Sequence, residues 1–405
     1  METKTSRSVC LVVLVSIVLG ILLRIYFLFQ PGYELDINTF IHWSGKISEG
    51  GFWSLYTSNY QSGLDYPPLI PYLGHYWLGL KFFWNLADQQ IFKLLPTLAE
   101  IIFSIIAAIF VWKSKSQYRA YLLVLVIIQP ALSLITTAWG QVDSVLALFL
   151  ICAFILIEKN LYLSTLFLFL ALLTKPQALF GILIFYIIVL FRKGVLNALR
   201  QLVFFLILTG LMYWLFASHS SNFLAVYLLS SNRYPLTSMN AFNFWWLIFG
   251  SSSFSISDTI GQILSYKTIG LSLFVAFLAP AVFYLYKKAK TLPEYFLAAS
   301  YIYLIFFTFP TQIHERYLYP AIALLPFAAI KNKKIFWVYI VLSVTLFLNN
   351  YAVLQSVIPQ LKEVASVLNL PVSSDFTKVI SLVNVVVAIY MAFNFIYESF
   401  KKDSK

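Results

Sequence analysis

Apolar runs of bilayer length recur along almost the whole chain, and they limit it to one class of fold. A run of about 20 apolar residues is long enough to cross the hydrocarbon core of a membrane as a helix. The composition agrees, because 60% hydrophobic and 11% charged residues over 405 positions leave too few polar side chains to cover a soluble surface. The sequence therefore predicts an all-α polytopic membrane protein.

The apolar runs predict about twelve transmembrane helices. They lie near residues 8–29, 92–112, 120–137, 143–158, 161–174, 177–191, 199–217, 268–286, 294–309, 317–330, 335–355 and 376–397. Two of these spans are short, which favours tilted or broken helices. One further apolar segment, residues 69–84, either crosses the membrane or lies along its outer surface.

The distribution of Lys and Arg decides between these two arrangements. If residues 69–84 lie in the plane of the membrane, every basic cluster between the predicted spans falls on one side. The positive-inside rule makes that side cytoplasmic. We therefore expect both termini in the cytoplasm and an external first loop, residues 30–91, that contains in-plane juxtamembrane helices.

The charge and the cysteines argue against two other classes of site. The net charge is +12, but no basic stretch has the spacing of an element that reads a nucleic-acid groove, so no nucleic-acid partner is expected. Cys10 and Cys152 lie in separate apolar runs and predict neither a disulfide nor a metal site. We interpret both as small buried core residues.

Polar motifs lie between the spans, and the predicted topology places all of them on the external face. They are Glu34 with Asp36, the turn at residues 65–68, WGQVD at 139–143, TKPQ at 174–177, the loop at 234–246 and HERY at 314–317. Their position on one face predicts a single cavity. The alternative is that each motif is merely a polar loop between helices, which is common for any one of them.

Four ionisable residues lie near the predicted outer ends of helices, where charge is costly. Arg24 and Glu100 both fall in the outer third of the bilayer and predict a structural ion pair. Lys175 and Arg316 each close a helix at the external surface, and neither has an acid on the same helical face. Two such cations suit a bound anion. For Lys175 alone, snorkelling to the lipid headgroups is an equal alternative.

The neighbours of these cations suggest which anion binds. A carboxylate, His314 and many Trp and Tyr residues suit a sugar joined to a phosphate, because aromatic faces bind the C–H surfaces of sugars. We expect the phosphate to belong to a membrane lipid, which reaches the site from the outer leaflet. An aqueous nucleotide sugar would lie on the opposite side of the membrane.

Sugar transfer from a lipid phosphate needs one base, because a phosphate diester leaves well when cations neutralise its developing charge. Asp36 is the candidate, since it closely follows the first span. Asp65 precedes two prolines and alternatively caps a turn. Glu34 can assist Asp36 or bind a divalent metal with it. The metal is not favoured, because the pair lacks a third ligand, and no cofactor is predicted.

The WGQVD and TKPQ motifs have a binding role and a structural alternative. Trp139, Gln141 and Asp143 either take part in donor binding or cap the fourth span at its outer end. Gln177 follows Lys175 and is placed with it at the donor.

Five further residues are singled out in the loops. His42 and His314 are interpreted as hydrogen-bonded orienting residues rather than metal ligands, because no pair of histidines has ligand spacing. Asn240 and Asn243 either contact the acceptor or make hydrogen bonds within their loop. Tyr66, with the two prolines that follow it, shapes the start of the in-plane helix.

The first loop resembles a known family, the lipid-phosphate-sugar-dependent glycosyltransferases of the C fold. The likeness rests on Asp36, on His42-Trp43 six residues later, on Trp53 with Leu55-Tyr56, and on GLDYPPL at residues 63–69. This loop is most similar to that of the ER glucosyltransferases of asparagine-linked glycan assembly. The resemblance implies that Asp36 is the catalytic base and that the transfer inverts the configuration of the sugar.

Later segments extend the resemblance. His314-Glu315-Arg316 matches a His-Glu-Lys segment of the family with Arg for Lys, which implies contact with the donor phosphate. WGQVD, LTKPQAL at residues 173–179 and the loop at 240–245 are more similar to bacterial members. Because the chain is short and has no N-x-S/T sequon, a bacterial plasma membrane is favoured over the ER membrane.

The sequence thus predicts a membrane hexosyltransferase built from two modules. The N-terminal catalytic module covers residues 1–217 and includes the first loop. The C-terminal module covers residues 218–405, with an external loop at 218–267 and the HERY segment. Its expected partners are a polyprenyl-phosphate sugar donor, a glycan or glycolipid acceptor and membrane lipids.

Two other classes remain open. A multi-spanning lipid or sugar transporter, or a flippase, also carries charges within the membrane. Against it, the chain shows no two-fold internal repeat, and its motifs collect at one surface rather than at the midplane. A ligase of the O-antigen type, using a diphosphate-linked glycan, would have one dominant large external loop in place of the early acidic loop.

Overall fold

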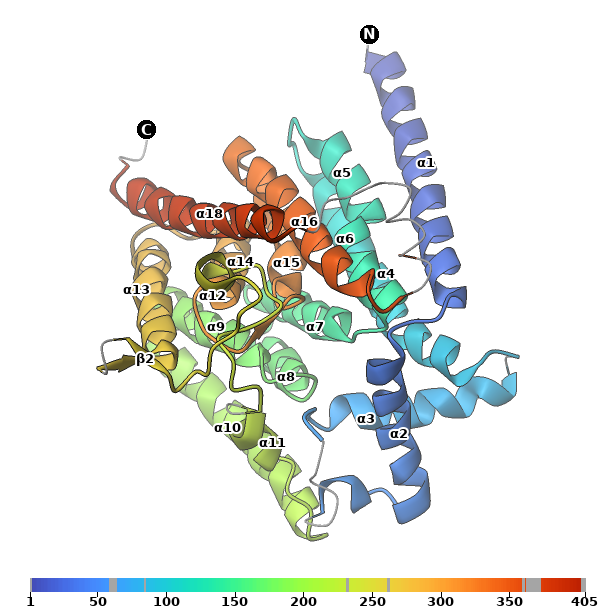
Figure 1. Ribbon diagram of the computed structural model, residues 1–405. Helices are drawn as coiled ribbons and strands as arrows, with labels where there is room; N and C mark the ends of the chain where they lie inside the picture. The colour runs from blue at the N-terminus through green and yellow to red at the C-terminus, as the bar shows by residue number, and fades with distance from the viewer. Residues whose placement is uncertain are drawn as a thin grey trace. The chain divides into compact units, whose positions relative to one another are not determined.

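The computed structural model describes residues 2–57, 64–83, 85–230, 233–260, 263–358, 361 and 373–401. These residues are mostly helical, as the apolar runs predict (Figure 1). Contacts divide the chain into two compact units, each drawn from three segments. The first unit holds residues 1–109, 123–182 and 195–233, and the second holds 110–122, 183–194 and 234–405. The last boundary between the units lies between residues 233 and 234. The sequence predicts the boundary between the two modules at residue 217.

The first unit begins with a long helix and continues into the loop that the sequence analysis singled out. Its elements are α1 (Glu2–Phe29), α2 (Glu34–Gly50), η1 (Ser54–Tyr56), α3 (Leu69–Leu78), η2 (Gly79–Phe83), most of α4 (Asp88–Lys113), most of α5 (Arg119–Ile128), α6 (Pro130–Ser133), η3 (Leu134–Trp139), α7 (Asp143–Leu156), α8 (Leu161–Leu172), the start of α9 (Ala178–Lys193), α10 (Val195–Ala217) and α11 (Ala225–Ser230).

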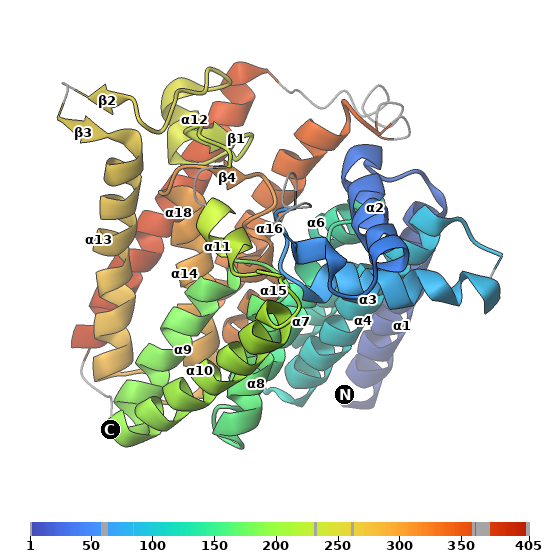
Figure 2. The ribbon, with the colours of Figure 1, turned by 90° about the horizontal axis from the view of Figure 1, so that it is seen from below.

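The second unit is a group of helices with short strands. Its elements are the ends of α4 and α9, the start of α5, β1 (Ser238–Met239), α12 (Phe244–Phe249), β2 (Thr259–Ile260), β3 (Leu264–Ser265), α13 (Tyr266–Lys287), α14 (Leu292–Thr308), β4 (Ile313–His314), α15 (Tyr319–Ala329), α16 (Lys333–Leu354) and α18 (Ser374–Phe400). Strands β1 and β4 pair in parallel, with Met239 opposite His314 (Figure 2). This pairing joins the loop at residues 234–246 to the HERY segment.

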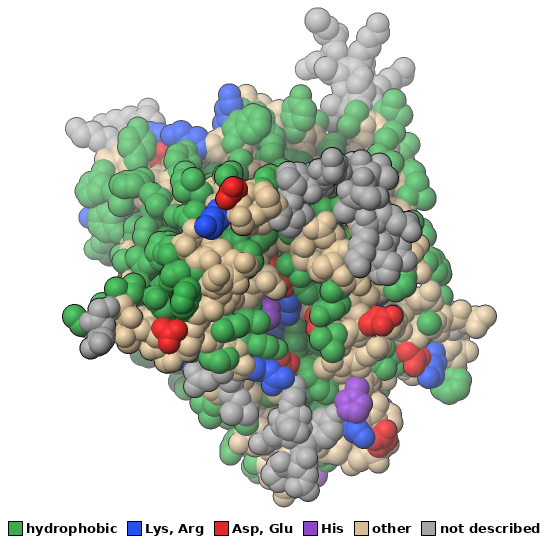
Figure 3. Space-filling view, viewed as in Figure 1, with side chains coloured by type: hydrophobic (Ala, Val, Ile, Leu, Met, Phe, Trp, Pro, Cys, Tyr) green, Lys and Arg blue, Asp and Glu red, His purple; other side chains and the backbone are tan. Residues whose placement is uncertain are grey.

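Several helices are long and apolar enough to cross a membrane. Among the described residues there are seven: Cys10–Phe29, Asp88–Lys113, Arg119–Trp139, Val195–Ala217, Tyr266–Lys287, Lys333–Leu354 and Ser374–Phe400. Shorter apolar helices are Asp143–Leu156, Leu161–Leu172, Leu292–Thr308 and Tyr319–Ala329. Hydrophobic side chains cover much of the face drawn in Figure 3, and charged ones stand at scattered places. The chain is therefore a helical membrane protein.

The third apolar run is broken rather than continuous. Helix α5 ends at Ile128, and Gln129 has a positive φ of 26° before α6 begins at Pro130. A proline disfavours helical geometry at the residue before it, which explains the position of the break. The run then continues through the π-helical segment η3 and ends at Gly140, whose φ is 95°.

The predicted ion pair between Arg24 and Glu100 is confirmed within the first unit. A guanidinium nitrogen lies 2.6 Å from Glu100 Oε1, and both side chains are buried. Arg24 also donates to the carbonyl of Ile127, the second-last residue of α5, at 3.1 Å, and Ser133 donates to Glu100 at 2.9 Å. The pair therefore ties α1 and α4 to both sides of the break at Gln129.

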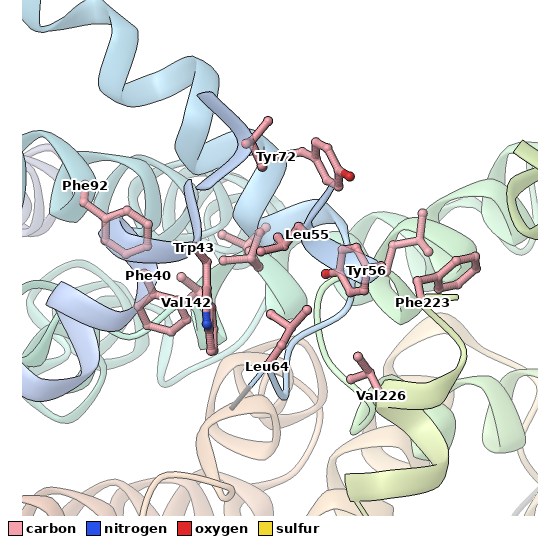
Figure 4. Packing of buried hydrophobic residues seen from close by; sticks show 14 of the residues in the cluster. Phe40, Trp43, Leu55, Tyr56, Leu64, Tyr72, Phe92, Val142, Phe223 and Val226 are labelled. Carbon is pink, nitrogen blue, oxygen red and sulfur yellow. The ribbon is translucent and has the colours of Figure 1, made fainter. Parts of the chain in front are cut away.

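The first loop folds onto a hydrophobic cluster of its own unit. Phe40 and Trp43 on α2, Tyr56 on η1 and Phe92 on α4 are buried together, and Phe223 packs against the same cluster (Figure 4). Helices α2 and α3 pack against one another, and the amide of Leu69 at the start of α3 donates to Leu173 O. This cluster holds α2 in place.

The apolar segment at residues 69–84 contains helix α3, which has 10 residues. This is about 15 Å of helix at the usual rise, which is too short to cross a bilayer.

Both cysteines are free. The interpretation of Cys10 as a buried core residue is wrong, however, because its side chain is exposed on α1, and Cys152 is only partly buried. A long apolar helix at the edge of a unit leaves one face uncovered, and Cys10 lies there.

Candidate functional site

Asp36 lies in the first turn of α2, directly after the corner that joins α1 to α2. The corner is attached to the WGQVD motif by its backbone, because the amide of Tyr33 donates to Trp139 O at 3.1 Å. The ring of Tyr33 also packs edge-on against Trp139, with 5.9 Å between the ring centroids. These contacts bring the start of α2 to the end of η3.

The carboxylate of Asp36 is held from one side only. Its Oδ2 accepts a hydrogen bond from Trp139 Nε1 at 2.9 Å and another from Gln141 Nε2 at 2.5 Å. Among the described residues, Oδ1 has no hydrogen-bond partner, and the side chain is partly exposed. Two donors to a charged acceptor orient the group strongly. The arrangement leaves one carboxylate oxygen free to accept a proton.

Two glycines allow the start of α2 to lie close to the WGQVD segment. Ile37, next to Asp36, is fully buried against Gly32 and Gly140. A Cβ at Gly32 would lie 2.2 Å from Ile37 Cδ1, and one at Gly140 would lie 2.6 Å from the same atom. Gly140 also needs its left-handed φ of 95°, which side chains rarely adopt. Gly140 is therefore required for two reasons. A side chain at this position would collide with Ile37, and its φ is one that other residues rarely adopt.

Gln141 connects Asp36 to Tyr66 of the first loop. Tyr66 donates its hydroxyl proton to Gln141 Oε1 at 3.3 Å, while the amide nitrogen of Gln141 donates to Asp36. Tyr56 in turn donates to Tyr66 O at 2.8 Å. Burial raises the pKa of Tyr56 well above its ordinary value, so this hydroxyl keeps its proton. The result is a chain of oriented groups that ends at the carboxylate.

Lys175 and Asp143 form a buried ion pair next to this chain. Lys175 Nζ lies 2.8 Å from Asp143 Oδ2, and each side chain is 3% exposed. Lys175 Nζ also lies 5.4 Å from the centre of the Tyr66 ring, within the range of a cation–π contact. The sequence shows no acid on the helical face of Lys175, but α7 supplies one from another helix. Lys175 therefore has a carboxylate partner within its own unit.

The residues of WGQVD have different local contacts. Asp143 opens α7, in the first turn where an acid suits the helix dipole. Trp139 and Gln141 donate to Asp36, a contact that the sequence did not predict. Gln177 is partly buried in the connection between α8 and α9, two residues beyond Lys175.

The remaining first-loop residues have varied surroundings. Glu34 and His42 are exposed on α2, whereas Trp43 is buried and packs against Tyr66 at 5.7 Å between ring centroids. Asp65 Oδ2 lies 3.2 Å from Arg233 Nε, so Asp65 forms an ion pair. The start of α3 has no side-chain cap.

The HERY segment forms a second cluster, within the second unit. Arg316 lies 2.8 Å from the buried Glu315, so the sequence neighbour neutralises this cation. His314 packs edge-on against Tyr234 at 5.0 Å between ring centroids and also contacts the Tyr317 ring. Arg316 thus resembles Lys175 in having a carboxylate partner already in place.

Asn240 and Asn243 differ in their surroundings. Asn243 is fully buried, accepts from the amides of Trp245 and Trp246, and so caps the start of α12. Asn240 has a positive φ of 61°, and its backbone carbonyl accepts from Asn349 Nδ2 at 2.8 Å, while its side chain is exposed. Hydrogen bonding of the side chain within the loop is thus shown for Asn243.

Several residues near these clusters were missed by the sequence analysis. The sequence indicated no role for Arg233 or Asn349, because their partners, Asp65 and Asn240, lie far away in the chain. It also did not predict that Glu315 is the counter-ion of its neighbour Arg316. Lys93 did carry a signal, since it is a basic residue at the start of an apolar run. It is fully buried in the structure.

No group of three or more His, Cys, Asp or Glu side chains gathers as metal ligands in the part of the chain that the structure describes.

No protein-family model matches this sequence, and no curated protein matches it either.

Proposed function

We propose that this protein is an integral membrane glycosyltransferase that transfers a hexose from a polyprenyl-phosphate donor to a glycan or glycolipid acceptor. We place it in a bacterial plasma membrane, with its termini in the cytoplasm and its site outside. The single observation that carries the proposal is the carboxylate of Asp36, with Oδ2 held by two donors and Oδ1 accepting from no residue that the structure describes. A general base needs both features, an enforced direction and a free oxygen.

The proposed reaction is a single displacement. An acceptor hydroxyl oxygen attacks the anomeric carbon of the sugar from the side opposite the phosphate. Its proton passes to Asp36 Oδ1, and the electron pair of the breaking bond leaves with the polyprenyl phosphate. One attack from the opposite side inverts the configuration of the sugar. Because the phosphate leaves as a stable anion, one base is enough, in contrast to the two carboxylates that glycosidases use.

The two paired cations have a defined place in this proposal. Lys175 and Arg316 are neutralised by Asp143 and Glu315, so neither is a preformed anion site with a spare charge. A donor phosphate beside either cation would compete with the carboxylate that is already paired with it. Lys175 also supports Tyr66 and, through it, Gln141, which gives it a contribution to the orientation of Asp36 even without phosphate contact.

The test is transfer by purified protein from a panel of polyprenyl-phosphate sugars, followed by the release of polyprenyl phosphate. Asp36→Asn should lower release by about 10³-fold or more, because a group that accepts a proton in the transition state contributes about 10²–10⁴-fold. Donor binding and folding should be retained. Glu49→Gln is the matched control, since Glu49 lies on the same helix but is exposed and distant in sequence from Asp36.

Two outcomes would contradict the proposal. Release by Asp36→Asn at the wild-type rate would remove the base. If wild-type protein consumes no donor in the presence of native membrane acceptors, but moves labelled lipid across proteoliposomes, the protein is a transporter or flippase instead.

A further inference from the structure

Lys93 buries its amino group without an acidic partner among the residues that the structure describes. It lies near the start of α4 and is fully buried. Its Nζ donates to the backbone carbonyls of Phe27 at 2.6 Å and Gln30 at 2.8 Å. Among the described residues, no carboxylate lies within ion-pair distance of it. In this it differs from Arg24 and Lys175, which are buried in the same unit but have Glu100 and Asp143 beside them.

The two carbonyls belong to the corner between α1 and α2. Phe27 lies in the last turn of α1, and Gln30 follows the helix directly. The last carbonyls of a helix have no partner within the helix, and they form the negative end of its dipole. Lys93 satisfies these groups at the point where the chain turns toward Asp36.

The same corner is connected to the groups that hold Asp36. Beyond Gln30, the amide of Tyr33 donates to Trp139 O, and Trp139 Nε1 donates to Asp36. On the other side, the stem of Lys93 lies near Gly140, with Cγ 3.4 Å from the place that a Cβ at this glycine would take. Lys93 therefore bonds the segment that leads to Asp36 and lies near the segment that carries its two donors.

Lysine differs from an apolar side chain of similar length at this position by its two hydrogen bonds. Burying an amino group costs free energy that hydrogen bonds to two neutral carbonyls offset only in part. A methionine would fill the space of the stem, but it would leave the carbonyls of Phe27 and Gln30 without this donor. What lysine adds is therefore the pair of hydrogen bonds, which fixes these two carbonyls relative to α4.

We propose that Lys93 is a positioning residue, which fixes the corner between α1 and α2 and thereby the direction of the Asp36 carboxylate. The inference rests on the proposed function, because it is the base whose geometry Lys93 sets. Lys93 touches neither substrate nor reacting atoms in this scheme, so its loss should affect the rate of transfer rather than the affinity for the donor.

The test compares Lys93→Met with Lys81→Met, a lysine on η2 that is half exposed and pairs with Asp88. Misplacing a reacting group by about 1 Å can cost about 10²-fold in rate. We therefore expect Lys93→Met to lower kcat by about 10²-fold with the donor KM within about twofold. Lys93→Arg, which keeps donors for both carbonyls, should recover part of this loss. Lys81→Met should leave kcat unchanged.

A second measurement does not depend on activity. Hydrogen exchange of the amides of Tyr33 and Ile37, which donate to Trp139 O and Tyr33 O, should become at least about tenfold faster in Lys93→Met. Exchange in α13, which belongs to the second unit, should not change. Local loosening with normal exchange elsewhere distinguishes positioning from general destabilisation.

The outcomes separate the two proposals. If wild type transfers sugar and Lys93→Met does so equally fast, the positioning role is overturned and the glycosyltransferase stands. If wild type transfers nothing but exchange at Tyr33 and Ile37 accelerates, the proposed function falls and the structural role of Lys93 stands. Should Lys93→Met fail to fold, Lys93→Gln replaces it, and an unchanged kcat in that variant also overturns the inference.

Discussion

Asp36 differs from Glu100, Asp143 and Asp65 in the partners that surround it. Each of these three acids faces a cation, at 2.6, 2.8 and 3.2 Å. The cation occupies a carboxylate oxygen that a substrate proton would otherwise approach. Asp36 has only neutral donors, an indole and an amide, among the described residues. At the scale of single residues, this is what separates a candidate base from structural acids that the sequence shows with equal prominence.

The amide of Gln141 provides a test at the same scale. Gln141→Leu removes a hydrogen bond to a charged group, which is worth about 1.5–3 kcal/mol. If that bond orients the base, kcat should fall by about 10- to 100-fold. The measurement is the initial rate of polyprenyl phosphate release with saturating donor and acceptor.

Gln89→Leu is the matched control for this substitution. Gln89 also bonds a side chain of α2, since it donates to Asn38 at 3.0 Å, but the contact is exposed. Its removal should leave the rate within about threefold, because exposed hydrogen bonds contribute little. Equal activity of both variants would show that Gln141 does not hold the base.

Helices form along the apolar runs, but seven of the described helices, against about twelve predicted spans, are long and apolar enough to cross a membrane. The spans expected near residues 335–355 and 376–397 are helices Lys333–Leu354 and Ser374–Phe400. Length and hydrophobicity determine such helices, so the sequence suffices to find them. The run near 120–137 is instead broken at Gln129, in front of Pro130. The break matters because η3 then delivers Trp139 to Asp36.

The ion pair of Arg24 and Glu100 gives a prediction for these elements. Arg24→Met leaves Glu100 buried without its cation, which typically costs about 3–5 kcal/mol. The Tm in detergent should therefore fall clearly. In the double variant with Glu100→Gln, the unpaired carboxylate charge is also removed, and the Tm should recover most of its decrease. A double variant as unstable as Arg24→Met would mean that packing, not charge, determines the loss.

At the scale of the whole molecule, the distribution of basic residues predicts the topology. In a variant with Cys10→Ser and Cys152→Ser, Glu49→Cys and Ser257→Cys should react with a membrane-impermeant maleimide from outside. Lys115→Cys should react only after permeabilisation. All three positions are exposed on the protein, so access depends on the membrane alone. The reverse pattern would place the Asp36 site in the cytoplasm and contradict the proposed lipid donor.

The sequence by itself determined the class of fold, the places of most helices and the choice of Asp36 as the candidate base. These follow from local properties, namely apolar length and the rarity of charge beside a membrane. Only the tertiary structure decided which groups surround that base. Trp139 and Gln141 reach Asp36 because two glycines admit Ile37, and Lys175 finds its counter-ion on another helix. Such partners lie far apart in the chain, and side-chain contacts between distant segments depend on packing that residue spacing does not encode.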